Sequence, residues 1–297
     1  MKNVGILVNK DRDTELKYTK AVAKCICRAG INAILLSDIA DLLGIENNCI
    51  IKKINEKEIL EEAEIIICLG GDGTFLKAAR KVYKEKLPIL GINLGNLGFL
   101  TEIEKNEIED AIRCLINNKY VIEERMMLES AIIRNGVIIG KDTALNDIVI
   151  SRGALSRILH VKTYINDVFV DMFPGDGLIV SSPTGSTAYS LSAGGPIVEP
   201  DIDLIIVSPI CPHILYSRSI ITAGDRKVRA VIDEEYTHEA MVTVDGQKGY
   251  EIRGGDIIEV KKSMHTIKLL RINPRNFYNI LRSKIYFRGE SLKQDEV

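Results

Sequence analysis

Residues 70–74, Gly-Gly-Asp-Gly-Thr, are the part of this sequence whose residue types and spacing most directly suggest chemistry. Three glycines let the backbone turn sharply and approach a ligand closely. We expect a helix to follow, with Thr74 as its cap, and the positive end of a helix suits a phosphate. Asp72 would repel that phosphate unless it holds a metal or accepts a proton. The alternative is an ordinary strand-to-helix turn with Asp72 as a local cap.

This loop differs from two well-known phosphate-binding motifs. It contains no Gly-Lys-Ser or Gly-Lys-Thr, which excludes a P-loop. Leu76 occupies the position of the third glycine in a dinucleotide-binding fingerprint. Asp72 is therefore the residue that distinguishes the loop.

Two short polar clusters follow in the second half of the sequence. Asn146 and Asp147 lie next to each other in a strand-like context, where an amide and a carboxylate could bind ribose hydroxyls or an amide group. An ordinary solvated turn or edge position explains the pair equally well. Asp176 lies between two glycines, and an Asp-Gly turn is its simplest explanation.

Residues 181–192 form a third cluster, in which seven of twelve residues are Ser or Thr. The run could be a rim of hydroxyls around a nucleotide, or a helix start capped by a hydroxyl. Tyr189 could stack on a base or a nicotinamide ring, or could be a core aromatic residue with a paired hydroxyl.

The first 120 residues predict the elements that would position the glycine loop. Short β-branched runs are typical of buried parallel strands, and longer stretches have the apolar spacing of helices. We expect an α/β domain with a Rossmann-like parallel sheet, with ligands beyond the carboxyl ends of its strands. The predicted strands are 4–8, 31–36, 65–69 and 87–94, the helices are 14–28, 74–84 and 107–118, and 41–62 is a short helix plus a connection.

After residue 120 the pattern changes to alternating β-branched residues between tight-turn dipeptides. The turns are Asn135-Gly136, Asn166-Asp167, Asp245-Gly246 and Gly254-Gly255. This pattern predicts a β-sandwich-like domain. Residues 277–284 regain helical spacing, and we expect this helix to pack on the first domain. We predict an α/β domain at 1–119, completed by 272–297, and a β-rich dinucleotide-binding domain at 120–271.

The composition excludes several classes of protein. With 46% hydrophobic residues and a net charge of −2, nothing indicates a nucleic-acid or membrane surface. No apolar run approaches the ~20 residues of a membrane span, and the apolar N-terminus is too short for a signal peptide. No Gly-x-Ser-x-Gly or His-Glu-x-x-His motif occurs. The six cysteines form no Cys-x-x-Cys pair, so we expect free thiols in a reducing cytoplasm rather than disulfides or a zinc site.

Five motifs taken together resemble the NAD kinases, in order and over nearly the whole length. The Gly-Gly-Asp-Gly-Thr loop alone is less specific, because diacylglycerol, sphingosine and phosphofructo-kinases have similar loops. The run at 175–196 is the most specific of the five. The motifs are residues 70–74, 93–102, 144–147, 175–196 and 245–247.

The resemblance implies an enzyme that phosphorylates the 2′-hydroxyl of the adenosine ribose of NAD to give NADP. It implies ATP, or also polyphosphate, as the donor, and a site in the crevice between an α/β and a β-rich domain. It implies a homodimer or homotetramer, and a divalent metal, Mg²⁺, carried with ATP. It assigns no metal ligand and no tightly bound organic cofactor.

The resemblance also assigns roles to residues. Asp72 matches the catalytic position, where we expect a general base. Many relatives have Glu at position 147, and Pro174 has no backbone N–H to offer a ligand. The positions that match dinucleotide contacts are Asp72, Gly73, Lys77, Asn146, Asp147, Arg157, Asp176, Thr187, Ala188, Tyr189, Ser190, Leu191, Ser192 and Gln247.

Two other functions are compatible with the same motifs. One is a lipid or sugar kinase with the same loop, although no exposed apolar segment is available for a membrane surface. The other is a non-catalytic module that binds NAD and regulates a partner. ADP release dependent on a sugar or diacylglycerol would indicate the first, and NAD binding without ADP release would indicate the second.

Overall fold

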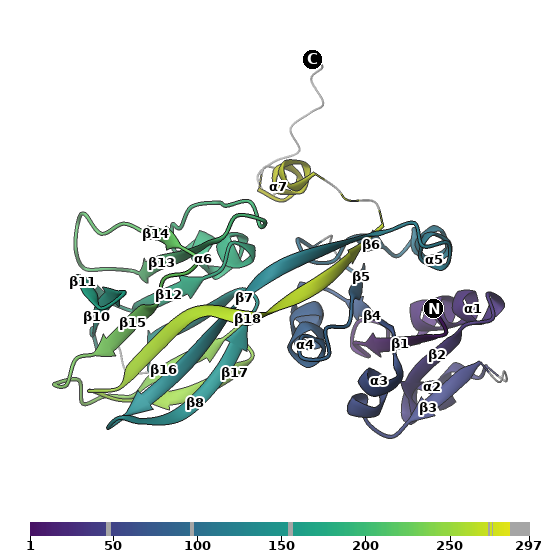
Figure 1. Ribbon diagram of the computed structural model, residues 1–297, viewed down its shortest axis with the longest axis horizontal. Helices are drawn as coiled ribbons and strands as arrows, with labels where there is room; N and C mark the ends of the chain where they lie inside the picture. Colours follow the sequence, from purple (N-terminus) through teal and green to yellow (C-terminus); the bar gives the residue numbers. More distant parts are fainter. Residues whose placement is uncertain (46–48, 96–97, 154–156, 273, 275, 286–297) are drawn as a thin grey trace, which may run out of the picture. The chain divides into compact units, whose positions relative to one another are not determined.

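The computed structural model describes residues 1–297 except 46–48, 96–97, 154–156, 273, 275 and 286–297. The chain divides into two compact units (Figure 1). Unit 1 comprises Met1–Ala78, Leu87–Glu123 and Leu269–Val297. Unit 2 comprises Ala79–Lys86 and Glu124–Lys268.

Unit 1 contains a parallel sheet with strand order β3-β2-β1-β4-β5. This is the order of a Rossmann-type sheet, and it confirms the predicted α/β fold. A ligand site in such a sheet lies where the strand order reverses, which here is between β1 and β4. The strands are β1 (Asn3–Val8), β2 (Asn32–Leu36), β3 (Ile50–Lys53), β4 (Ile65–Gly70) and β5 (Ile89–Asn93), with the short β6 (Ile103–Glu104) paired to β5.

Helices cover both faces of this sheet because its strands are apolar on both sides. Ile65 and Ile67 of β4 share one core with α1 (Lys17–Arg28), α2 (Ser37–Leu43) and α5 (Ile108–Ile116). The opposite face carries α3 (Glu56–Glu62) and α4 (Asp72–Val82). A Cβ at Gly91 of β5 would lie 2.9 Å from the ring of Phe75, so α4 packs closely on the sheet.

Two elements of unit 1 differ from the prediction. Helix α1 begins at Lys17 rather than at residue 14. The Asp13 carboxylate accepts the N–H groups of Tyr18 and Thr19, which lie in the first turn of the helix and have no partner within it. The edge strand β3 was missed within 41–62. Half of its four residues are lysines, which protect a sheet edge but weaken the apolar signal of a strand.

The prediction that the cysteines are free thiols is wrong for one pair. Cys27 near the end of α1 and Cys49 just before β3 form a disulfide, with Cα atoms 5.6 Å apart. Cys25, Cys68, Cys114 and Cys211 form no disulfide among the described residues, and of these four only Cys68 is buried. Spacing could not reveal the bond because the two residues are 22 positions apart and meet only through the packing of α1 beside the sheet.

Reduction of Cys27–Cys49 is expected to lower the free energy of unfolding by about 3 kcal/mol, because the bond closes a loop of moderate length in the unfolded chain. Urea unfolding with and without reductant measures this change. Cys27→Ser should behave like the reduced wild type, whereas Cys25→Ser, on the same helix, should not. Titration of six thiols in non-reducing denaturant would contradict the bond.

Unit 2 contains two sheets that share one apolar core. In β12, Leu178 and Val180 point into this core, whereas Ile179 packs with Val149 on the other face. This alternation confirms the β-sandwich-like fold. One sheet has the order β14-β13-β12-β9-β16-β17, and the other contains β11, β10, β15, β18, β7 and β8. The strands are β7 (Val121–Arg134), β8 (Val137–Ala144), β9 (Asp147–Arg152), β10 (Leu159–Ile165), β11 (Val168–Gly175), β12 (Gly177–Ser181), β13 (Leu204–Ile210), β14 (Ile220–Ala223), β15 (Val228–Ile232), β16 (Ala240–Val244), β17 (Lys248–Ile252) and β18 (Ile257–Arg271).

The predicted tight turns join consecutive strands of unit 2. Asn135-Gly136 connects β7 to β8, Asn166-Asp167 connects β10 to β11, and Asp245-Gly246 connects β16 to β17. Both residues of each dipeptide have positive φ, as type I′ turns require, and the β16–β17 connection also contains Gln247. These three turns were predicted correctly.

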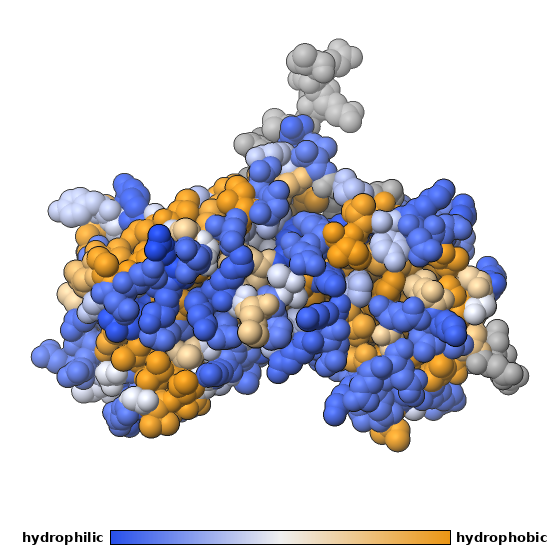
Figure 2. All heavy atoms as spheres, viewed as in Figure 1, coloured by the Kyte–Doolittle hydropathy of each residue, from blue (hydrophilic) through white to orange (hydrophobic). Residues whose placement is uncertain are grey.

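The C-terminal helix α7 (Phe277–Ile285) belongs to unit 1. The rings of Phe277 and Phe99 have centroids 6.5 Å apart. No helix among the described residues is long and apolar enough to span a membrane. Figure 2 shows hydrophobic and hydrophilic residues interspersed over the drawn face of each unit.

Candidate functional site

The glycine loop of unit 1 passes directly from β4 into α4. The helix begins at Asp72, so the prediction that Thr74 caps it is wrong. The N–H groups of Thr74 and Phe75 both donate to the carbonyl oxygen of Gly71. The first turn of the helix is therefore already closed at Thr74, where the cap was expected. The Thr74 hydroxyl accepts a hydrogen bond from the side chain of Asn9, which follows β1, at 3.0 Å. The loop therefore lies at the point where the strand order of the sheet reverses.

The Asp72 carboxylate accepts four hydrogen bonds from the next glycine-rich loop. Oδ1 accepts the N–H of Leu100 at 3.2 Å, the N–H of Thr101 at 3.1 Å and the Thr101 hydroxyl at 3.0 Å. Oδ2 accepts the N–H of Phe99 at 2.8 Å. A Cβ at Gly98 would lie 1.7 Å from Oδ1, so this approach requires glycine. Asp72 thus holds the loop that follows β5, rather than acting as a cap for its own turn.

The two oxygens of Asp72 differ in what they can still accept. A carboxylate has about four acceptor positions in total, two on each oxygen. Oδ1 already has three donors, whereas the Phe99 N–H is the one donor to Oδ2 among the described residues. Oδ2 is therefore the oxygen that can accept a hydrogen bond or a proton from a ligand.

The glycines on either side of Asp72 present open surface. A Cβ built at Gly71 or Gly73 would have no atom within 4 Å. Gly73 and Lys77 are four residues apart on α4 and both exposed, so they lie on one face of the helix. Folding of the described residues does not require glycine at these two positions. A ligand that approaches the backbone closely would require it.

Gly73→Ala is expected to preserve the fold, and the stability should stay equal or rise by up to about 1 kcal/mol because Ala favours a helix. The added methyl group should lower kcat/KM about 10- to 100-fold by displacing a ligand that touches this backbone. Thermal unfolding and steady-state kinetics measure the two effects. An unchanged kcat/KM would show that ligands approach from elsewhere.

In unit 2, three segments meet at one end of neighbouring strands. Asp147 begins β9 directly after Asn146, and it pairs with Ser181 at the end of β12. On the other side of β9, Ile148 pairs with Val244, the last residue of β16. The turn with Asp245 and Gln247 follows. The structure therefore brings together Asn146, Asp147, Gln247 and the start of the hydroxyl-rich run.

Asp245 holds this arrangement together. Its carboxylate accepts three consecutive backbone N–H groups, from Leu145 at 3.0 Å, Asn146 at 2.8 Å and Asp147 at 3.2 Å. The sequence indicated Asp245 as part of a hairpin turn and of the motif at 245–247, but not as an acceptor for the backbone of residues 145–147. An Asp-Gly turn explains an aspartate so readily that its second role left no signal in the sequence.

Asp147 and Asp245 form a pair of buried carboxyl groups. Burial, followed by the charge of Asp245, raises the pKa of Asp147 to about 7. Burial also raises the pKa of Asp245, although its three backbone hydrogen bonds act in the opposite direction. At neutral pH the Asp147 carboxyl is therefore partly protonated and can both donate and accept a hydrogen bond.

The stability of the protein should fall between pH 4 and 7 because of Asp147. The pKa of this group is about 7 in the folded state against 3.8 for an ordinary Asp, so the folded state binds more protons in this window. The contribution of Asp147 to the free energy of unfolding is complete below pH 3.8. It is lost as the pH rises to 7, by about 1.4 kcal/mol per pH unit. Asp147→Asn should remove this slope in urea unfolding, whereas Asp201→Asn, at an exposed position, should keep it. Parallel curves for wild type and Asp147→Asn would contradict the raised pKa.

Much of the hydroxyl-rich run faces inward. It forms η1 (Thr184–Thr187) and the single turn α6 (Tyr189–Ser192). The expectation of a hydroxyl rim is wrong for the four serines that are fully buried with their hydroxyls bonded inside the unit, namely Ser181, Ser182, Ser186 and Ser190. Tyr189 is 46% exposed, which excludes a core position and leaves its ring available to a ligand. Thr187, Ala188 and Leu191 are half-buried, and Ser192 is exposed.

Two predicted residues lie at the opposite end of the same strands. Asp176 precedes β12, and its carboxylate pairs with Arg152 at the far end of β9, at 2.6 Å. Asn146 and Arg152 are six positions apart in the sequence, or roughly 20 Å at the usual rise of a strand. Arg157 is exposed and lines a separate cavity of about 520 Å³ with His160 and His238. The structure of one chain does not bring Asp176 or Arg157 to Asn146.

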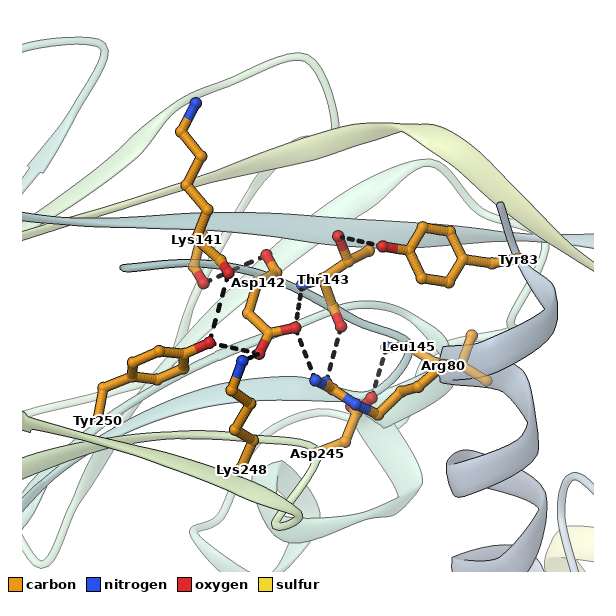
Figure 3. A network of polar contacts seen from close by, with 10 residues as sticks. Arg80, Tyr83, Lys141, Asp142, Thr143, Leu145, Asp245, Lys248 and Tyr250 are labelled. Carbon is orange, nitrogen blue, oxygen red and sulfur yellow. Dashed lines mark hydrogen bonds and ion pairs between the residues drawn. The ribbon is translucent and has the colours of Figure 1, made fainter. Parts of the chain in front are cut away.

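A polar network in unit 2 precedes the Asn146 segment and was not predicted (Figure 3). Asp142 of β8 accepts hydrogen bonds from Arg80 at 2.7 Å and from the Tyr250 hydroxyl at 2.8 Å, and Lys248 lies 3.5 Å away. Arg80 also donates to the carbonyl of Thr143 at 3.0 Å. Burial acts to raise the pKa of Asp142, but these donors outweigh it and leave the pKa below its usual value. The network anchors the last turn of α4 to the strand that leads to Asn146.

Comparisons with known proteins identify the family. The model of the ATP-NAD kinase N-terminal domain matches residues 4–120, and that of the C-terminal domain matches residues 145–272. A curated NAD kinase of Acetivibrio thermocellus is 57% identical over 99% of this chain and 100% of its own length. The chain belongs to the NAD kinase family. It is a kinase that transfers phosphate to a hydroxyl group, and the comparisons do not favour the lipid or sugar kinase or the non-catalytic module.

Further NAD kinases resemble the chain in sequence and in fold. The NAD kinase of Ruminiclostridium cellulolyticum is 50% identical over 98% of this chain and 100% of its own length. The crystal structure of yeast NADH kinase complexed with NADH matches with a TM-score of 0.88 and 25% identity, over 100% of this chain and 90% of that one. The NAD kinase from Archaeoglobus fulgidus in complex with ATP has the same fold, with a TM-score of 0.75, 24% identity, and coverage of 96% and 98%.

Proposed function

We propose that this chain phosphorylates the 2′-hydroxyl of the adenosine ribose of NAD with ATP, giving NADP. The observation that carries the proposal is the Asp72 carboxylate at the start of α4, with one oxygen anchored and the other able to accept a proton. The crystal structures of relatives that contain NADH and ATP support these two kinds of substrate.

In the proposed reaction, Asp72 acts as the general base through Oδ2. A ribose hydroxyl is a weak nucleophile until a base accepts its proton. Oδ1 stays bonded to Leu100 and Thr101, which keeps the carboxylate in one orientation while Oδ2 approaches the hydroxyl. General-base assistance of this kind is worth about 10²- to 10⁴-fold in rate.

The donor phosphates are proposed to bind at the N-terminal end of α4. The partial positive charge of the helix end and the open surface at Gly71 and Gly73 suit an anion that approaches the backbone, and Lys77 adds a positive charge on the face of Gly73. We propose that Mg²⁺ enters with ATP, where it would neutralise charge on the transferred phosphoryl group. Among the described residues, no group of three or more His, Cys, Asp or Glu side chains could hold a metal ion.

The dinucleotide is proposed to bind to the Asn146 segment of unit 2. The Asn146 amide and the partly protonated Asp147 carboxyl offer both donors and acceptors to ribose hydroxyls. The exposed ring of Tyr189 offers a surface for stacking. Gln247, in the turn that Asp245 begins, remains a proposed contact, as do Thr187, Ala188 and Leu191. The buried Ser190 hydroxyl already bonds to Ser208.

Assembly as a homodimer or homotetramer is also part of the proposal. Asp176, paired with Arg152, lies roughly 20 Å from Asn146 along β9, and Arg157 lines a separate cavity. A second copy of the chain could bring them to a dinucleotide bound at Asn146, which supports an oligomer. We further propose a cytoplasmic location and polyphosphate as an alternative phosphate donor. We also propose that the two functional domains divide at residues 119 and 271.

Asp72→Asn is expected to retain NAD binding and to lower kcat about 10²- to 10⁴-fold, because the amide keeps the shape of the side chain but is not a base. NADP formation from ATP, Mg²⁺ and NAD, detected with an NADP-specific dehydrogenase, measures turnover. Calorimetry measures NAD binding.

Asp201→Asn, at an exposed position of unit 2, serves as the control and should behave like the wild type. Unchanged turnover in Asp72→Asn would exclude the role as a base. If the wild type released ADP without forming NADP, the proposed substrate would be wrong.

A further inference from the structure

The C-terminal helix α7 contacts the loop that is bonded to Asp72. The Lys284 ammonium lies 4.9 Å from the centroid of the Phe99 ring, within the range of a cation–π interaction. The ring of Phe277 lies 6.5 Å from the same ring, between centroids. Phe277 and Lys284 are seven residues apart, so they lie on the same face of α7. This face of the helix is turned toward Phe99.

Phe99 links this contact to the carboxylate. Its backbone N–H donates to Asp72 Oδ2 at 2.8 Å, and the next two residues of the loop donate to Oδ1. Any movement of Phe99 therefore changes the one hydrogen bond made by the oxygen that we assign as the base. The path from Lys284 to Oδ2 runs through a single residue, and all of its members belong to unit 1.

We propose that α7 is a positioning element of the catalytic site, in which Phe277 and Lys284 hold Phe99 so that Asp72 Oδ2 is aimed at the acceptor hydroxyl. The inference rests on the proposed role of Asp72 and adds a dependence of that role on a segment about 200 residues away in sequence. Phe277 and Lys284 act through Phe99 and need not touch either substrate.

Lys284→Gln removes the cation while keeping much of the length and polarity of the side chain. We expect kcat to fall about two- to fivefold, the size of one exposed cation–π contact. The KM for NAD and the thermal midpoint should not change, because the contact affects the orientation of the base rather than binding or folding. Lys284→Arg should restore kcat, since a guanidinium also binds to an aromatic face.

Arg282→Gln is the matched control, because Arg282 is an exposed cation on the same helix. It should keep the kcat of the wild type. An equal loss in Arg282→Gln, an unchanged kcat in Lys284→Gln, or failure of Lys284→Arg to restore activity would overturn the proposal. A fall in thermal midpoint that accounts for the lost activity would also overturn it.

A second measurement does not depend on turnover. The chain has no tryptophan, so Phe99→Trp introduces a single tryptophan at the contact. Its emission should shift to longer wavelength when Phe277→Leu and Lys284→Gln are added, as the indole becomes more exposed to water. Identical emission spectra would overturn the docking of α7. This result would leave the proposed function intact, whereas a wild type that forms no NADP would remove the function itself.

Discussion

The site of unit 1 depends on the hydrogen bonds between the Asp72 carboxylate and the backbone of residues 99–101. A loop rich in glycine loses much conformational entropy when it becomes ordered, and these bonds offset part of that cost. Glycine at position 98 is required because the carboxylate occupies the space of a side chain. Three of these bonds saturate Oδ1 of Asp72, whereas Oδ2 accepts only the fourth and can still accept another donor. Order in the loop and orientation of the base therefore have a single cause.

Unit 2 uses the same physical device for a different purpose. Asp245 also accepts consecutive backbone N–H groups, those of residues 145–147, but it is buried. Burial and the neighbouring charge of Asp245 raise the pKa of Asp147 to about 7, so that carboxyl is partly protonated at neutral pH. Asp72 thus organises the loop that follows β5, and Asp245 organises the segment that leads into β9. Both act on backbone N–H groups, so either could order segments of very different sequence.

The sequence predicted most of the helices and strands because their signals are local. The β-branched run before Gly70 and the turn at Asn135 depend on neighbours within a few positions. What the sequence did not reveal depends on distant contacts. The Cys27–Cys49 bond, the clamp by Asp245 and the inward direction of the buried serines all require knowledge of which strands are adjacent. The start of α4 at Asp72 was missed because Thr74 is a good cap by type, although its hydroxyl bonds to Asn9 instead.

The central claim is that Oδ2 of Asp72 receives the proton of the acceptor hydroxyl while Oδ1 remains bonded to the loop. A crystal structure of the protein with bound NAD tests it most directly. We predict that the ribose 2′-hydroxyl will lie about 2.6–3.2 Å from Oδ2, with the bonds from Leu100 and Thr101 to Oδ1 preserved. A bound dinucleotide whose 2′-hydroxyl lies out of reach of both oxygens, with Asp72 still bonded to residues 99–101, would contradict the account.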